Sequence, residues 1–222
     1  MKFIDMGKKR EETFAEETVL DLLGKSYSDI KILQMGAIEH KEPEPRMSAA
    51  DWYGARGVRK VVSIDLNGQD GALTHDLDYP IPKDLHAKFD LVTNYGTGEH
   101  VNDQYSFFRN CHDACKSNGV MIHLLLHEGF LPGHGRYYYS QETTFRLARM
   151  CSYRLVYLQN YSGVKTGRRG FLVAAFQNRA VSSFPGKSRF LQRARILDTG
   201  DTRRTSDYNA AGHGLNELEA NF

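Results

Sequence analysis

The feature that most constrains the fold is a series of short apolar segments that end in a polar residue or a glycine. Their length and their content of Val, Ile, Leu, Tyr and Phe are typical of β-strands rather than of helices. The predicted strands are residues 30–35, 61–66, 72–77, 89–95, 120–126, 153–161 and 170–177. A turn with Gly, Lys and Arg joins the last two, which predicts an antiparallel hairpin.

Segments with the spacing of amphipathic helices lie between these strands. The predicted helices are residues 11–23, 48–55, 103–116 and 140–150. Two of these segments begin with a serine as the predicted N-cap, Ser48 and Ser140, the second without a full capping box. Asn118-Gly119 predicts a turn. This alternation predicts an α/β fold: a doubly wound, mostly parallel, seven-stranded sheet with helices on both faces and a terminal antiparallel hairpin.

The chain length and the sequence pattern predict one main domain with extensions. A chain of 222 residues fits a single α/β domain, which we place at residues 29–178. Residues 1–28 form an N-terminal helical segment. Ser, Gly, Arg, Asp and Asn dominate residues 179–222, so we expect a partly irregular C-terminal extension there.

The charge balance narrows the classes of partner. Basic and acidic side chains number 29 and 27, a net charge of +2, which argues against nucleic acid or a membrane as a required partner. No apolar run reaches the roughly 18 residues of a membrane span, and the charged start does not resemble a secretory signal. We therefore expect a cytoplasmic protein, with Cys111, Cys115 and Cys151 as free, buried thiols.

Candidate site residues follow the strands, because a sheet of this kind binds ligands beyond the carboxyl ends of its strands. Asp65 is the sharpest candidate, since its carboxylate can accept hydrogen bonds from both hydroxyls of a ribose. The alternative is a strand-ending Asp that caps a turn. Asp76 is a candidate neighbour of an adenine ring, or else a loop Asp that accepts backbone N–H groups.

Four stretches in this order and spacing resemble the Rossmann-like (class I) S-adenosylmethionine-dependent methyltransferases: KILQMGAIEH, VVSIDLNG, THDLDYP and FDLVTNYGTGEHV. The resemblance covers residues 30–177 and includes CKSNGVMIHLLLHEG and YYYSQETTFRLARMCSYRLVYLQ as the approaches to the later strands. It implies S-adenosylmethionine as the cofactor.

The resemblance also implies a cofactor site. The loop that begins at Gly36 would wrap the methionine part, Asp65 would bind ribose, Asp76 would contact the adenine amine and Asn94 would border the methyl group. The whole implied site comprises Gly36, Ala37, Asp65, Leu66, Asp76, Leu77, Asn94 and Tyr95. The family usually has several glycines in the first loop, whereas here Gly36 alone remains.

A methyl acceptor that is a hydroxyl would need a general base at the same sheet edge. The candidates are His127 and Glu128 after the fifth strand, His100 after the fourth, next to Glu99, and His134 in the following loop. Each histidine has an alternative as a packing, hydrogen-bonded or exposed loop residue. We expect no metal, because the pair His123 and His127 lacks a third ligand.

Residues 129–139 contain glycines and three tyrosines, which predicts either a lid over the acceptor or a packed segment below the next helix. Arginines at 168, 169 and from 189 to 204 suggest an anionic substrate, or a solvated surface.

The sequence therefore predicts a methyltransferase that acts on a small-molecule acceptor, with a hydroxyl preferred to nitrogen or carbon. The sparse first loop keeps open a non-catalytic binding or assembly module with the same fold. Methylation of nucleic acid or protein is less favoured, because no Asn-Pro-Pro-aromatic element follows the fourth strand.

Overall fold

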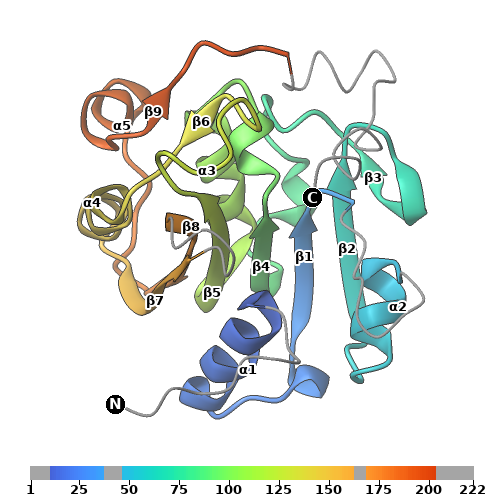
Figure 1. The fold of residues 1–222 in the computed structure, drawn as a ribbon. Coiled ribbons are helices and arrows are strands. Elements are labelled where there is room, and N and C mark those ends of the chain that lie inside the picture. The colour runs from blue at the N-terminus through green and yellow to red at the C-terminus, as the bar shows by residue number, and fades with distance from the viewer. Residues whose placement is uncertain (1–10, 38–46, 163–168, 204–222) are drawn as a thin grey trace.

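The computed structural model describes residues 11–37, 47–162 and 169–203 (Figure 1). Seven strands form one sheet in the order β3-β2-β1-β4-β5-β8-β7. They are β1 (Lys31–Met35), β2 (Lys60–Asp65), β3 (Leu73–Thr74), β4 (Phe89–Tyr95), β5 (Cys115–Leu126), β7 (Arg154–Ser162) and β8 (Arg169–Gln177). A second sheet pairs β6 (Tyr137–Tyr138) with β9 (Leu197–Asp198).

Helices and short 3₁₀ turns connect these strands. The α-helices are α1 (Glu11–Leu23), α2 (Ala49–Gly54), α3 (Gln104–Ala114), α4 (Gln141–Cys151) and α5 (Lys187–Arg193). The 3₁₀ helices are η1 (Tyr27–Asp29), η2 (Gln69–Gly71), η3 (Lys83–Leu85) and η4 (Gly98–His100). None of the helices within the described ranges combines the length and the apolar character that crossing a bilayer requires.

The strand pairing confirms the predicted architecture. The first five strands of the sheet run parallel to one another: β3, β2, β1, β4 and β5. Strand β8 lies between β5 and β7 and is antiparallel to both. The strand order reverses between β1 and β4, which both point the same way in Figure 1. This reversal is the topological switch point, where such sheets bind their ligands beyond the carboxyl ends of the strands.

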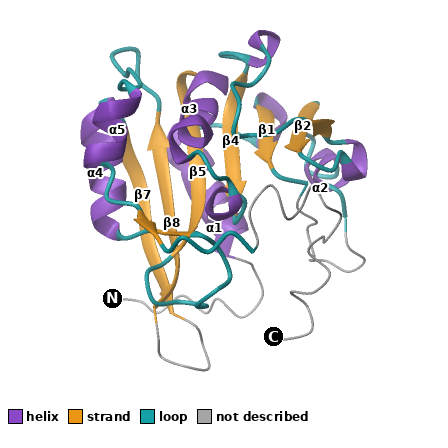
Figure 2. Cartoon of the chain, turned by 90° about the horizontal axis from the view of Figure 1, so that it is seen from above, coloured by secondary structure: helices purple, strands orange, loops and turns teal. Residues whose placement is uncertain are grey.

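The sheet separates two apolar layers (Figure 2). Residues of α3, α4 and α5 form one layer against one face, with Phe107, Leu147 and Phe190 at its centre. Residues of α1 and α2 form the other layer, with Val19 and Tyr53 inside it. Because both faces are covered, the central strands read as nearly continuous apolar runs, which made them visible in the sequence.

A buried carboxylate ties the second layer together. Glu16 of α1 accepts hydrogen bonds from the hydroxyls of Tyr27 (2.7 Å), Tyr53 (2.5 Å) and Tyr95. Burial, reinforced by the negative charge of Glu16, raises the pKa of the Tyr27 hydroxyl above its usual value. Three separate segments, η1, α2 and β4, thus converge on one side chain of α1.

Local sequence signals set most of the helix ends. The Ser48 side chain accepts the amide of Asp51 and begins α2, as predicted. Ser140 begins α4 and forms a full capping box, because the Thr143 hydroxyl accepts the Ser140 amide at 3.1 Å. The prediction of an incomplete box was therefore wrong, since a threonine hydroxyl serves here where Glu or Gln is more common.

Two further predictions need correction. The expected turn at Asn118-Gly119 lies inside β5, where the pairing with β4 shifts register and Asn118 has a φ of 64°. The expected strand at residues 72–77 is limited to Leu73–Thr74, two exposed residues at the sheet edge with β2 as partner. The extension after residue 178 contains α5 and β9, while residues 204–222 lie outside the described ranges.

Candidate active site at the carboxyl ends of the strands

Asp65 ends β2 and holds the first residues that follow β1. Its Oδ2 accepts the amide of Ala37 at 2.8 Å, and its Oδ1 accepts the amide of Asn67 at 3.0 Å. Gly36 turns the chain away from β1 with a φ of 94°, a conformation that favours glycine. Each carboxylate oxygen of Asp65 keeps a second lone pair, so the side chain can still accept a ligand hydroxyl.

The residues after β2 and β3 meet η4 around a small cavity. Four of the predicted cofactor residues line it together with one predicted catalytic residue, His100. The full lining is Asp65, Leu66, His75, Asp76, Leu77, Thr97, His100 and Val101. The cavity volume is about 50 Å³, whereas sites for drug-sized ligands are on the order of 300–1,000 Å³.

Asp76 has its own local hydrogen bond. Its Oδ1 accepts the amide of Asp78 at 2.9 Å, which is the loop role foreseen as its alternative. The side chain is half-buried at the cavity wall, and its other oxygen is available for a ligand amine.

Asn94 and Tyr95 do not line this cavity. The buried Asn94 side chain accepts the amides of Thr97 (3.1 Å) and Gly98 (3.0 Å), so it shapes the loop that leads into η4. Tyr95 belongs to the apolar layer of α1 and α2, where its hydroxyl meets Glu16. Their cofactor contacts therefore stay predictions. The hydrogen bonds of both side chains go to other parts of the protein and not to the cavity.

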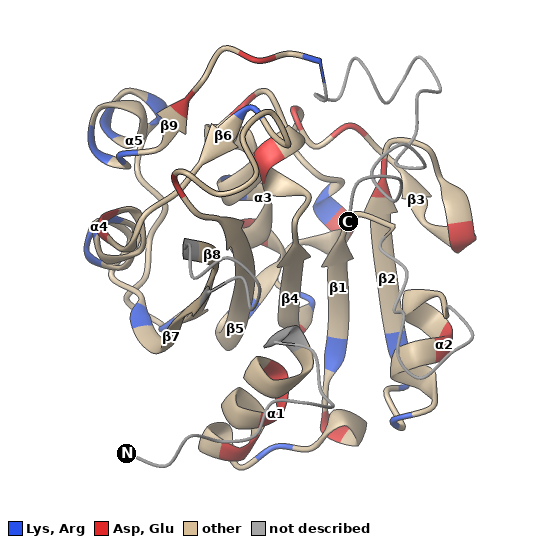
Figure 3. Ribbon diagram, in the orientation of Figure 1, with Lys and Arg blue, Asp and Glu red and all other residues tan. Residues whose placement is uncertain are grey.

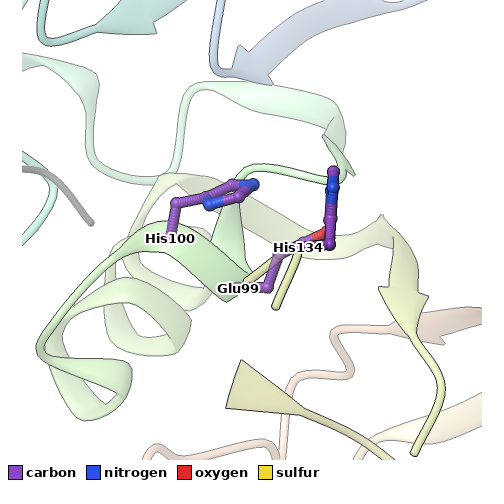
Figure 4. Close-up of side chains that lie close together, drawn as sticks. All are labelled: Glu99, His100 and His134. Carbon is purple, nitrogen blue, oxygen red and sulfur yellow. The ribbon is translucent and has the colours of Figure 1, made fainter. Parts of the chain in front are cut away.

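Glu99, His100 and His134 gather next to the cavity (Figure 4). One ligand atom from each side chain lies within 4.8 Å of the other two, and His134 Nε2 is 4.0 Å from Glu99 Oε1. The rings of His100 and His134 meet edge to face at a centroid distance of 5.2 Å. The structure thus joins two of the four predicted catalytic residues with a carboxylate.

The Glu99 carboxylate is fully buried, and within the described part of the chain neither of its oxygens has a hydrogen-bond partner. Burial raises its pKa to about 8. A buried group of this kind costs free energy unless a proton or a positive charge compensates it. Glu99 is therefore a functional-site candidate on physical grounds.

Gln104, which the sequence reasoning did not single out, supports η4 from below. Its Nε2 donates to the carbonyl oxygens of Gly98 (2.6 Å) and Val101 (2.9 Å). Its Oε1 accepts the hydroxyl of the buried Tyr139 at 2.7 Å. The only sequence signal was an amide in the first turn of an amphipathic helix.

His127 and Glu128 lie apart from this group. The buried His127 ring has Nδ1 at 2.9 Å from the Glu128 carbonyl oxygen, and the Glu128 side chain is exposed. Their catalytic roles stay predictions. Tyr137, Tyr138 and Tyr139 are all buried, which favours packing over the lid interpretation.

The basic residues near the C-terminus occupy a different surface. Arg189 and Arg193 of α5 line a groove of about 360 Å³ with Arg146 and Arg149 of α4. Figure 3 shows these helices at the opposite end of the sheet from β2. Arg168 and Arg204 lie outside the described residues.

No protein-family model and no curated protein matches this sequence. Solved structures do share its fold. A methyltransferase from Mesorhizobium loti has a TM-score of 0.53 and 16% identity over 73% of this chain and 97% of its own.

Two further similar structures were solved with S-adenosylhomocysteine. The 1,6-didemethyltoxoflavin-N1-methyltransferase of Burkholderia thailandensis has a TM-score of 0.50 and 14% identity over 79% of this chain and 93% of its own. The N-methyltransferase NodS of Bradyrhizobium japonicum has a TM-score of 0.51 and 14% identity over 75% and 86%. The fold is therefore that of the class I S-adenosylmethionine-dependent methyltransferases, as the sequence resemblance implied.

Proposed function

We propose that this chain transfers a methyl group from S-adenosylmethionine to a small-molecule acceptor, with a hydroxyl as the first candidate. The observation that carries the proposal is the position of Asp65. Its carboxylate ends β2 at the switch point, accepts the amide of Ala37 after β1 and borders the cavity that His100 also lines. Two of the similar structures are N-methyltransferases, so nitrogen is the second candidate for the acceptor atom.

The residue types at the cavity suit an adenosyl group. The Asp65 carboxylate can accept both hydroxyls of a sugar diol, Leu66 and Leu77 offer apolar walls, and Asp76 can accept from an exocyclic amine. The volume of about 50 Å³ accepts only part of such a group. Binding of the whole cofactor therefore requires the cavity to widen.

The residues of the chain contribute mainly alignment. When bound, S-adenosylmethionine supplies an already activated methyl group on its sulfonium. Asp65 and Asp76 would orient the nucleoside, and the loop at Gly36 and Ala37 would border the methionine part. His100 and His134 would lie on the acceptor side, where proximity and in-line orientation account for much of the rate.

Calorimetry with S-adenosylhomocysteine and S-adenosylmethionine tests the cofactor assignment. Asp65→Asn should weaken binding by about tenfold or more, because an amide oxygen is a poorer acceptor than a carboxylate. Asp84→Asn, which removes an exposed carboxylate in η3, should leave the affinity unchanged. Equal affinities of wild type and Asp65→Asn would refute the role of Asp65.

The small cavity and the single glycine of the first loop favour a second candidate, a non-catalytic module with this fold. A ligand that binds only the native state must raise the melting temperature. If neither adenosyl compound raises it at millimolar concentration, the methyltransferase proposal fails and the second candidate stands.

A further inference from the structure

We propose that Glu99, His100 and His134 bind one divalent transition-metal ion beside the cavity. The three side chains come from two segments, the 3₁₀ helix η4 and the loop before β6. Within the described part of the chain, no other group of three His, Cys, Asp or Glu side chains has this arrangement. The pair His123 and His127, weighed from the sequence, is therefore not the relevant one.

The distances suit a site that closes slightly around its ion. Metal–nitrogen and metal–oxygen bonds are about 2.0–2.2 Å long, so two ligand atoms on one ion are roughly 3.5 Å apart in a tetrahedral site and at most about 4.4 Å apart on opposite sides of the ion. His134 Nε2 and Glu99 Oε1 already satisfy this limit at 4.0 Å. All three ligand atoms lie within 4.8 Å of one another, so side-chain movements of less than about 1.5 Å would bring them onto one ion.

The strongest independent observation is the Glu99 carboxylate. Both of its oxygens are buried, and neither has a hydrogen-bond partner among the described residues. Figure 4 shows this carboxylate directed toward the His134 ring. A bound cation would replace the missing hydrogen bonds and compensate the cost of burying the charge.

The surrounding fold holds the three residues in place. Gln104 and Asn94 bind the backbone of the loop and of η4, which present Glu99 and His100. Gly135 brings the His134 loop close, because a Cβ at this position would lie 2.9 Å from Cβ and Cγ of Glu99. A preorganised frame of this kind is what a metal site needs.

The ligand set points to a class of metal. Two imidazoles and one carboxylate suit Zn²⁺, Fe²⁺, Co²⁺ or Mn²⁺, whereas Mg²⁺ and Ca²⁺ prefer oxygen ligands alone. Three protein ligands leave coordination positions open, as in catalytic sites. His100 also lines the cavity, so an ion here would be placed to polarise an acceptor hydroxyl; this role rests on the proposed function, but binding itself does not.

Metal binding is measured on the full chain after treatment with a chelator. Titration with CoCl₂ should give visible absorption bands that saturate at one ion per chain. Addition of ZnCl₂ should abolish these bands, because Zn²⁺ displaces Co²⁺ from the site. Glu99→Gln and His134→Gln should each weaken Co²⁺ binding by about tenfold or more, because each removes a charged or imidazole ligand. His86→Gln, in the loop after η3, should bind Co²⁺ as the wild type does.

Melting curves of the metal-free variants guard against loss of folding. Glu99→Gln replaces a buried carboxyl group by a neutral amide of similar size and should melt no lower than the wild type in the absence of metal, while the metal-induced rise in melting temperature should disappear. No saturable Co²⁺ binding to the wild type, or binding of Co²⁺ to both ligand variants with the wild-type affinity, would overturn the metal site. Since no adenosyl compound is present, this failure is distinct from failure of the cofactor proposal, which calorimetry with S-adenosylhomocysteine decides.

Discussion

His123 is a histidine enclosed by the aromatic rings of Phe108 and Phe176, with centroids 5.3 Å and 5.8 Å away. Burial lowers its pKa to about 3. The unfolded chain therefore binds a proton below about pH 6.5 that the folded chain does not bind until about pH 3. Its contribution to stability is complete above the unfolded pKa and is lost as the pH falls.

We expect His123 to reduce the free energy of unfolding by about 2 kcal/mol between pH 7 and pH 5. Urea unfolding of the wild type and of His123→Leu at both pH values measures this. The variant should lose less stability than the wild type over the same interval, whatever its stability at pH 7. Parallel pH profiles of the two proteins would show that His123 is not the responsible group.

The sequence predicted the position of a residue well where one strand alone determines it. Asp65 follows a run of aliphatic residues, so both its position at the strand end and its direction toward the switch point could be anticipated. The group of Glu99 and His134 could not, because loop geometry brings η4 and a distant segment together. Asn94 and Tyr95 end a strand as predicted, but the side-chain directions depend on contacts with α1 and η4.

At the level of elements, helix α5 is more than an appendage. Phe190 is fully buried and contacts the rings of Tyr105 and Phe108 of α3. Leu191, the next residue, is 60% exposed. The helix therefore completes the apolar layer on the α3 face of the sheet.

Phe190→Ala should reduce the free energy of unfolding by about 3–5 kcal/mol, because it leaves a large cavity in a packed layer. Leu191→Ala is the matched control and should change it by less than about 0.5 kcal/mol. Chemical denaturation at neutral pH measures both. A Phe190→Ala variant as stable as the control would mean that α5 is dispensable for the core.

Helix α5 was not predicted from the sequence, unlike the other α-helices. The strands β1, β2, β4, β5, β7 and β8 and the helices α1 to α4 were all expected, because each carries a run or period of apolar residues. Helix α5 has seven residues, of which Phe190 and Leu191 are the large apolar ones, so no period could be recognised. Its position is fixed by tertiary packing of one aromatic ring.

At the level of the whole molecule, stability should decrease from the centre of the sheet to its edge. Strands β4, β5 and β8 each lie between two neighbouring strands and are mostly buried, whereas β3 consists of two exposed residues with one partner strand. In native-state hydrogen exchange, amides in β4, β5 and β8 should exchange only through global unfolding. Amides in β3 should exchange through local opening, with free energies of opening lower than the free energy of global unfolding.

Equal protection of β3 and β4 would contradict this gradient. The comparison needs no variant, and urea dependence of the exchange rates separates local from global opening. The cavity residues that follow β3 should then show intermediate protection, consistent with a site that has to widen for its ligand.

The insertion of β8 between β5 and β7 has a consequence for how the protein is made. Strand β5 emerges from the ribosome roughly fifty residues before the strand that covers its outer edge. At a translation rate of about 5–20 residues per second, β8 is synthesised several seconds after β5, and the outer edge of β5 stays unpaired for that time. During that interval the unpaired edge of β5 is exposed to pairing with strands of other chains. Binding of a chaperone to the nascent chain would prevent this pairing.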